Sequence, residues 1–133
     1  RPYGTALLIA GVDDSRPRLF ETDPSGALLE YKATAIGAGR NAFMEIFEAD
    51  YSDDMDMDAA VMLGMKALYR STEGKLNAAT LEVGLVTLEE RQFRKLSEDE
   101  VETYVGRIQE ELKDEFASEE EENTEDPEEG SEE

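Results

Sequence analysis

The sequence predicts an α+β fold in which antiparallel strands and helices occupy separate stretches of the chain. Apolar residues form short strand-like runs over residues 4–37 and recur at helical spacing over residues 40–71. A strand-like pattern returns over residues 79–96, and a last helical pattern follows it. Strands and helices are therefore grouped, whereas an alternating α/β protein would interleave them.

The first group contains three candidate strands joined by short connections. GTALLIAGV, residues 4–12, is an apolar run of the kind that forms a buried strand. PRLFET follows it. DPSG at residues 23–26 then marks a turn, because proline presets the first turn dihedral and glycine permits a tight exit. ALLEYKATAIG, residues 27–37, supplies the returning strand, so we expect an antiparallel meander.

Two helices follow the meander, in RNAFMEIFEADY at residues 40–51 and in DMDAAVMLGMKALYRS at residues 56–71. Asp56 or Asp58 can cap the start of the second helix. The predicted core stripes are Phe43, Ile46, Phe47 and Tyr51 in the first helix and Met57, Val61, Met65 and Leu68 in the second. A line of small residues suits close packing against a neighbouring helix: Ala60, Gly64 and Ala67.

A second hairpin and a last helix complete the pattern. ATLEVGLVTL, residues 79–88, alternates as a strand does, residues 89–92 form the turn, and FRKL is the partner strand. Ser97 and Glu100 have the spacing of a capping box, in which each side chain bonds the backbone N–H of the other residue. The predicted stripe of the last helix is Val101, Tyr104, Val105, Ile108 and Leu112.

The composition excludes several classes of function. The 133 residues include no cysteine and no histidine, so Ser-His and Cys-His nucleophile pairs and thiolate or imidazole zinc sites are not available. The 34 acids and 13 bases give a net charge of −21, which repels phosphate backbones and makes nucleic acid an unsuitable partner. No apolar segment is long enough to cross a bilayer and no signal peptide opens the sequence, so we expect no membrane partner and a cytoplasmic location.

The acidity divides the chain into a domain and a tail. Ten of the acids lie within residues 117–133, where no aromatic or branched apolar residue occurs, so we expect a disordered acidic tail there. Residues 1–116 keep 24 acids against 13 bases and form the predicted domain. Only five bases are lysines, and a strongly acidic, lysine-poor surface is what solubility in a high-salt cytoplasm favours, so we expect a halophilic setting.

One stretch resembles a dinucleotide-binding fingerprint. Gly37, Gly39 and Ala42 match G-x-G-x-x-G/A at the change from a strand pattern to a helical one. Such a site needs a parallel βαβ unit whose second strand ends in an acid about 20 residues beyond the glycines. Here that position lies in the helical pattern of residues 57–68, and the preceding strand is the last of a meander. We therefore predict no bound cofactor.

Acidic clusters also fail the spacing required of a metal or catalytic site. DDMDMD resembles a calcium loop, but counting from Asp54 puts Ala59 at the sharp-turn glycine position and Met65 at the bidentate glutamate position. These acids fit better at a helix N-terminus, where they interact favourably with the helix dipole. No pair of carboxylates has an apolar context that would raise a pKa. We predict no metal site and no catalytic residue.

The sequence contains RPYG, LLIAGVD, LFETDPSG, YKATAIGAGR and an acidic helix start. Together these pieces resemble the C-terminal half of archaeal proteasome α-type subunits. These belong to the N-terminal-nucleophile hydrolases of the peptidase T1 family. The resemblance covers nearly all of residues 1–112. It implies an αββα sandwich, in which two antiparallel sheets stack between helix layers, with only its C-terminal part present.

The resemblance also implies a function. α-type subunits form heptameric rings that cap the β-type rings of the 20S core particle, which hold the threonine peptidase sites. They scaffold those rings and gate substrate entry for ATP-dependent protein degradation, and they cleave no bonds themselves. The implied partners are neighbouring α subunits, β-type subunits and a regulatory ATPase, the proteasome-activating nucleotidase.

A β-type subunit of the same family is the first alternative. Active β-type chains carry R-D-x-x-S-G after the second of these helices, where this chain has RSTEG at residues 70–74. They carry G-S-G-S where this chain has GAGR at residues 37–40. Both differences remove hydroxyl or carboxylate groups that support the nucleophile, which favours the non-catalytic α type. An acidic α+β interaction module unrelated to proteolysis is the second alternative.

The family's first half has no counterpart in this sequence. That half supplies the N-terminal gate segment, the helix pair that meets the β ring and the lysine pocket that receives the tails of the regulatory ATPase. We therefore expect this chain to be a fragment, from a truncated gene model or a partial reading frame.

Overall fold

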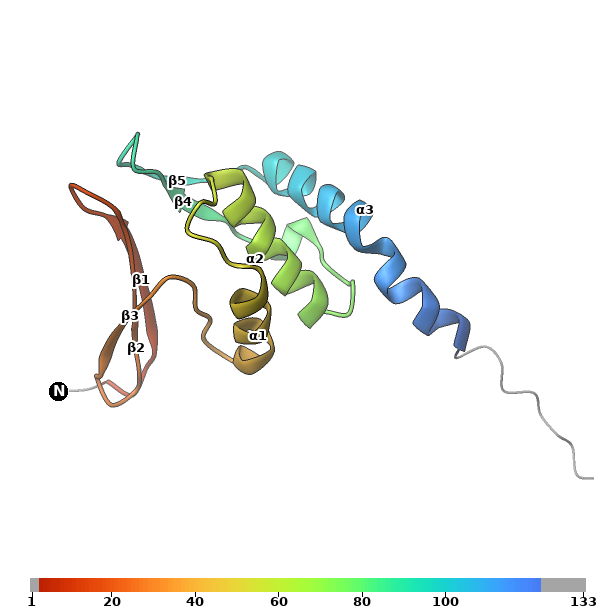
Figure 1. Cartoon of the computed structure of the whole chain (residues 1–133), viewed down its shortest axis with the longest axis horizontal. Coiled ribbons are helices and arrows are strands. Elements are labelled where there is room, and N and C mark those ends of the chain that lie inside the picture. Colours follow the sequence, from red (N-terminus) through yellow and green to blue (C-terminus); the bar gives the residue numbers. More distant parts are fainter. Residues whose placement is uncertain (1–2, 123–133) are drawn as a thin grey trace, which may run out of the picture.

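A computed structural model describes residues 3–122, with side chains through Glu115. Its elements, in chain order, are β1 (Leu7–Val12), β2 (Pro17–Thr22), β3 (Leu28–Tyr31), α1 (Arg40–Asp50), α2 (Met57–Ser71), the 3-10 helix η1 (Ala78–Thr80), β4 (Gly84–Val86), β5 (Phe93–Lys95) and α3 (Glu98–Glu122). The predicted order of strands and helices is confirmed, with η1 as an addition (Figure 1).

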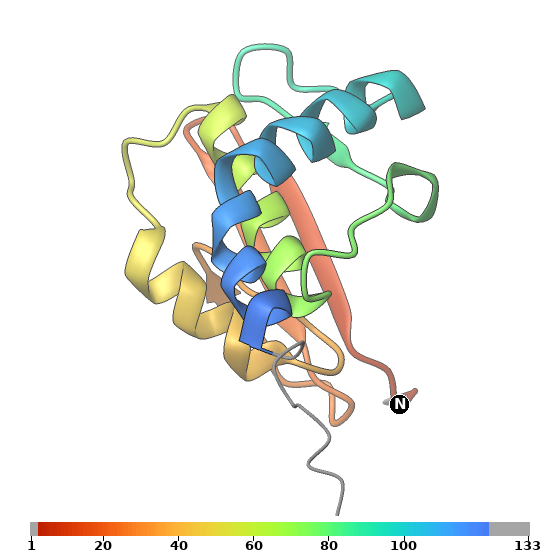
Figure 2. The ribbon, with the colours of Figure 1, turned by 90° about the vertical axis from the view of Figure 1, so that its right-hand side faces the viewer.

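The strands form two separate antiparallel sheets, so the α+β class is confirmed. The three-stranded sheet has the order β1-β2-β3, as a meander requires, and β4 pairs with β5 alone. The helices α1 and α2 lie between the three-stranded sheet and α3 (Figure 1). After a quarter turn, seen from the side of α3, this helix lies in front of α2 (Figure 2). The described residues do not build the full four-layer sandwich that the resemblance implies.

The hydrophobic core lies among α2, α3 and the segments that lead to and from the β4–β5 hairpin. Its buried apolar residues are Leu63, Met65, Ala67, Tyr69, Leu76, Leu96, Val101, Val105, Ile108 and Leu112. The stripe predicted for α3 is confirmed, with Tyr104 half-buried at its edge. Because this stripe needs only one covered face, its helical spacing was sufficient to identify it.

The stripe predicted for α2 is wrong in part. Met57 is exposed, whereas Leu63, Ala67 and Tyr69 are buried together with Met65. Residues two apart on a helix point to nearly opposite sides, so burial at every second position means that α2 is covered on more than one side. It packs against both α1 and α3, and a helix in this central position has no single core face.

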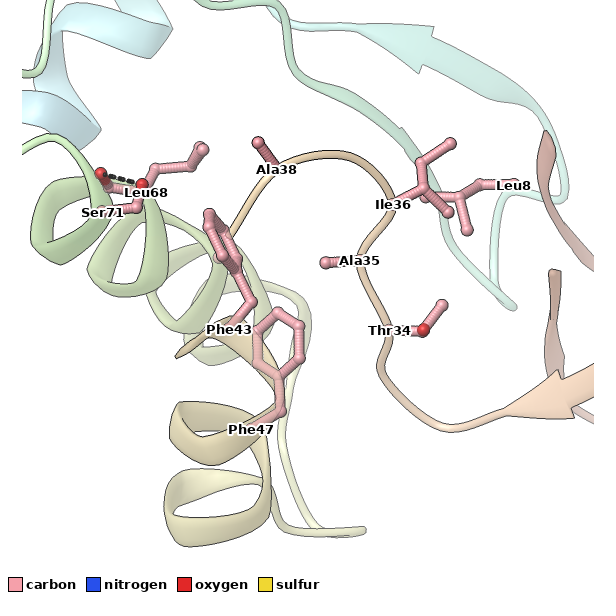
Figure 3. A pocket seen from close by; sticks show the side chains of 10 residues that line it. Leu8, Thr34, Ala35, Ile36, Ala38, Phe43, Phe47, Leu68 and Ser71 are labelled. Atoms are coloured by element: carbon pink, nitrogen blue, oxygen red, sulfur yellow. Dashed lines mark hydrogen bonds between the residues drawn. The ribbon is translucent and has the colours of Figure 1, made fainter. Parts of the chain in front are cut away.

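The prediction of a buried first strand is also wrong. In β1, Leu7, Leu8 and Ile9 keep 53%, 43% and 49% of their surface exposed. Within the described residues no element covers the face of the sheet that points away from the helices, and an open groove lies on the other face (Figures 1 and 3). An apolar run shows that a strand has side chains suited to burial. Burial itself requires a second layer of helices or strands that packs on the sheet.

Two predicted strands are shorter in the structure. β3 ends at Tyr31, and residues 32–39 cross to α1 as an irregular linker. Residues 79 and 80, the start of the strand predicted over residues 79–88, belong to η1 instead, because the Asn77 side chain accepts a hydrogen bond from the Ala79 N–H at 2.9 Å and so caps a helical turn. The alternating pattern of side chains could not reveal that this hydrogen bond favours a helical turn over a strand.

The predicted turns and helix starts are confirmed where local chemistry decides them. Asp23 Oδ1 accepts from the backbone of Ser25 and Ala27, and Gly26 has φ 92°. Of the two candidate caps of α2, Asp56 is the one used, since it accepts from the Ala59 N–H at 2.8 Å. The reciprocal bonds of the Ser97–Glu100 capping box are 2.9 and 3.2 Å long.

The last helix reaches into the segment for which we predicted a tail. α3 runs to Glu122 and so includes residues 117–122. The rest of the predicted tail, residues 123–133, lies outside the described residues. The boundary at residue 116 remains a prediction.

Candidate functional site

The linker between β3 and α1 makes a sharp turn at its two glycines. Gly37 has φ 101° and Gly39, the N-cap residue of α1, has φ 80°, a region that side chains with a Cβ rarely adopt. β3 is an edge strand, and its neighbour in the described sheet is the antiparallel β2. The parallel strand pair that a dinucleotide site requires is therefore not built by this meander. The two glycines serve a turn from sheet to helix.

This linker borders an open apolar groove between the three-stranded sheet and the helices. The groove has a volume of about 490 Å³. Phe43 and Phe47 of α1 lie on one side of it and Leu8 and Ile36 on the other (Figure 3). The remaining lining residues are Thr34, Ala35, Ala38, Gly64, Leu68 and Ser71.

The groove brings together the two segments in which this chain differs from active β-type chains. Ala38 belongs to GAGR and Ser71 to RSTEG, and both line the groove although 32 residues separate them in sequence. In the sequence the two differences lie in separate segments. The structure places both differences at one site.

The polar groups that line the groove have hydrogen-bond partners. Thr34 Oγ1 donates to Glu21 Oε2 at 2.8 Å, and Ser71 Oγ donates to the Leu68 carbonyl at 2.9 Å (Figure 3). Of the described residues that line the groove, none is titratable. These side chains offer an apolar surface, and they supply neither a carboxylate nor a hydroxyl that another group activates.

An ion pair lies beside the groove and joins the sheet to α1. Arg40 Nη2 is 3.0 Å from Glu21 Oε2, and its guanidinium lies 5.8 Å from the centre of the Tyr31 ring. Interaction with Tyr31, and then the charge of Glu21, raises the pKa of Arg40. Glu21 was not among the residues predicted from the sequence. An acidic residue at an inward-facing position of a strand pattern does, however, indicate a shielded ion pair of this kind. Register places Glu21 opposite Leu8, which lines the groove.

Side-chain hydroxyl groups at the C-terminus of α2 donate hydrogen bonds to carbonyls of its last turn. Thr72 Oγ1 donates to the carbonyls of Leu68 and Tyr69 at 2.9 and 3.2 Å. Glu73 and Gly74 both have positive φ, and the Gly74 N–H donates to the Tyr69 carbonyl at 2.9 Å, as in a helix C-cap. Thr72 is thus a capping residue in this structure.

Three of the four acids of DDMDMD are also engaged in contacts within the chain. Asp53 accepts from Lys32 Nζ, Asp56 caps α2, and Asp58 binds Arg107. Among the side chains that the structure describes, those of residues 3–115, no three acidic groups come close enough together to hold a metal ion.

Helix length and hydropathy bear on membrane insertion. None of the helices in the described part of the chain is both long and apolar enough to span a bilayer.

Comparison with known sequences identifies the class of protein. The sequence model of one family, described as "Proteasome subunit", matches residues 1–86, which is more than half of the chain. The chain belongs to the proteasome subunit family. Its fold is accordingly that of the proteasome family, which is N-terminal-nucleophile-hydrolase-like, and the described residues form an α+β part of it.

Individual relatives within the family share one more specific name, proteasome subunit alpha. The chain is 71% identical over 119 residues to a protein of Methanosarcina acetivorans named proteasome subunit alpha, and this alignment covers 90% of the chain and 48% of that protein. A protein of the same name from Methanosarcina mazei is 72% identical over 85% of the chain and 45% of its own length. One from Methanothermobacter thermautotrophicus is 51% identical over 81% and 44%. The chain thus spans about half the length of these relatives.

Proposed function

We propose that the intact protein is an α-ring subunit of an archaeal proteasome core particle. The observation that carries this proposal is the 71% identity, over nine tenths of the chain, to a protein named proteasome subunit alpha. In this role the subunit scaffolds the β rings and gates substrate entry for ATP-dependent protein degradation. Residues 1–116 form the C-terminal part of the α-type domain, and the acidic residues 117–133 follow it as a tail.

We further propose that the subunit is non-catalytic. Support comes from the groove where GAGR and RSTEG meet. Ala38 presents a methyl group there, and the Ser71 hydroxyl donates to the Leu68 carbonyl. A nucleophile needs a neighbouring base or a lowered pKa, and neither side chain supplies one. The Thr72 hydroxyl, bonded to two backbone carbonyls, is committed to the end of α2.

The proposed partners are neighbouring α subunits in a heptameric ring, β-type subunits and the regulatory ATPase, all in the cytoplasm. Membership of a family of assembled subunits supports the first two. The net charge of −21 supports protein partners over nucleic acid, because a phosphate backbone would be repelled.

Coexpression of the intact subunit with a β-type partner tests the proposal. We expect native mass spectrometry to show heptameric α rings bound to β rings, and peptide hydrolysis to persist in the Thr72→Ala and Glu73→Ala variants. As a control, alanine at the nucleophilic threonine of the β-type partner should abolish hydrolysis while rings still form.

Two results would contradict the proposal in different ways. Loss of turnover in Thr72→Ala with ring assembly intact would show that this chain contributes to catalysis, as a β-type subunit does. A monomer that ignores the β-type partner would favour an interaction module unrelated to proteolysis.

A further inference from the structure

A second hollow lies on the side of α2 that points away from the three-stranded sheet. Four residues of α2 line it: Ala59, Met62, Leu63 and Lys66. Gly64, Leu68 and Ser71 of the same helix line the groove toward the sheet. At about 3.6 residues per turn, the two sets lie on opposite sides of the helix. A further layer packed on the sheet therefore leaves this hollow open.

The walls of the hollow are apolar and belong to the packed helical body. Leu63 of α2 and Ile108 of α3 line it and are buried core residues. Met55, from the connection between α1 and α2, and Met62 add flexible thioether side chains, which adapt to the shape of an apolar guest. The volume is about 220 Å³, below the roughly 300–1,000 Å³ of pockets that hold drug-sized ligands. The hollow therefore fits a single side chain of a protein better than a cofactor.

The charges that line the hollow leave one carboxylate without a close partner. Lys66 Nζ lies 2.6 Å from Asp50 Oδ2, so these two lining charges neutralise each other. Glu111 of α3 is the third charged residue of the lining, and it forms no hydrogen bond or ion pair with another side chain that the structure describes. It acts on the charge of Arg107, but two hydrogen bonds already hold that guanidinium on Asp58. Apolar walls and one available negative charge thus lie together.

From these observations we propose that the hollow is a docking site for a partner protein that inserts an aliphatic side chain flanked by lysine or arginine. The aliphatic side chain packs against Met55, Met62 and Ile108, and a flanking basic group pairs with Glu111. Charge complementarity favours this partner, because a chain with a net charge of −21 attracts a basic segment and repels an acidic one. Docking here does not require the ring assembly proposed above.

Methyl NMR of the intact subunit, labelled at its methionine methyl groups, tests the site. The probe is the peptide acetyl-Gly-Lys-Leu-Lys-Gly-amide, and Met55→Leu and Met62→Leu assign the two signals that report on the hollow. We expect both signals to shift saturably at millimolar peptide. Alanine in place of the leucine should weaken binding by about tenfold, because less apolar surface is buried. Glutamate in place of both lysines should abolish binding, because these groups repel Glu111.

Glu111→Gln tests the charge at the rim. It should weaken binding of the lysine peptide by about threefold, the ratio expected for an exposed ion pair. Glu102→Gln is the matched control, since Glu102 is an exposed acid nine residues earlier in α3 and so lies on the opposite side of that helix. This variant changes the net charge equally and should leave the affinity unchanged.

Three results would overturn the proposal. Signals of Met55 and Met62 that do not move at millimolar peptide would show that the hollow is closed or binds nothing in the intact subunit. Equal binding of the lysine and glutamate peptides would show that the hollow does not select a basic partner. Equal weakening by Glu111→Gln and Glu102→Gln would show a general attraction to the acidic chain in place of a contact at Glu111.

Discussion

Asp58, in the first turn of α2, accepts hydrogen bonds from two nitrogens of Arg107 in α3, at 2.7 and 2.9 Å. The Tyr104 hydroxyl donates to the same carboxylate at 3.0 Å. The two helices that form the core are thus joined at their surface by a two-pronged ion pair, the strongest geometry available to these groups. The contacts lower the pKa of Asp58 from 3.8 to about 2, first through Arg107 and then through Tyr104.

This lowered pKa predicts how the stability of the chain depends on pH. A carboxyl whose pKa is lower in the folded state stabilises the fold fully above its unfolded value, and the contribution disappears as the pH falls through the folded value. For Asp58 the loss lies between about 3.8 and about 2. Asp58→Asn should therefore lower the urea midpoint at neutral pH, and the difference from wild type should shrink over that window.

Arg107→Gln provides the control for this experiment. This variant keeps Asp58 but removes its main partner. The pH dependence of the urea midpoint that the pair causes in the wild type should therefore be absent from Arg107→Gln. A difference between wild type and Asp58→Asn that stays constant down to pH 2 would contradict the assignment to this pair.

Burial predicts a strong contrast between two isoleucines. Ile108 in α3 is 1% exposed, so Ile108→Ala should lower the free energy of unfolding by about 2–5 kcal/mol, through lost burial and the cavity left behind. Ile9 in β1 is half exposed, so Ile9→Ala should cost only about 1 kcal/mol. Urea unfolding followed by circular dichroism measures both. Equal losses would mean that the outer face of β1 is covered in solution.

Two glycines predict opposite effects of the same substitution. Gly106 lies inside α3 with no atom within 4 Å of its missing Cβ, so Gly106→Ala should stabilise the chain by roughly 0.5–1 kcal/mol. Gly84 lies in β4, where a Cβ would come within 2.5 Å of the Phe93 ring. Gly84→Ala should displace that ring and lower the midpoint of thermal unfolding. A rise in the midpoint for both variants would show that Phe93 does not rest on Gly84.

Sequence patterns predicted best those features that depend on a few neighbouring residues. The capping box of Ser97 and Glu100 and the turn at residues 23–26 formed as expected, because each is decided by hydrogen bonds within four residues. The stripe of α3 was equally clear, since one face of that helix meets the core. The same reasoning failed for Met57 and for β1, where burial depends on elements far away in the sequence.

The candidate site was predictable only in parts. GAGR and RSTEG could each be compared with β-type chains, but neither pattern indicates that Ala38 and Ser71 line one groove. The role of Glu21 depends on strand register, which brings it opposite Leu8 and within reach of Arg40 and Thr34. Such pairings are long-range contacts, and short-range periodicity carries no information about them.

The sequence by itself determined the α+β order of elements, the helix caps, the glycine turn before α1 and the proteasome family. These follow from backbone preferences, local hydrogen bonds and shared motifs, which act over short distances. Only the tertiary structure decided that α2 is buried on more than one side, that β1 stays exposed and that the Glu21–Arg40 pair links the sheet to α1. The reason is physical: burial and ion pairing depend on which surfaces meet in space, and the order of residues does not state this.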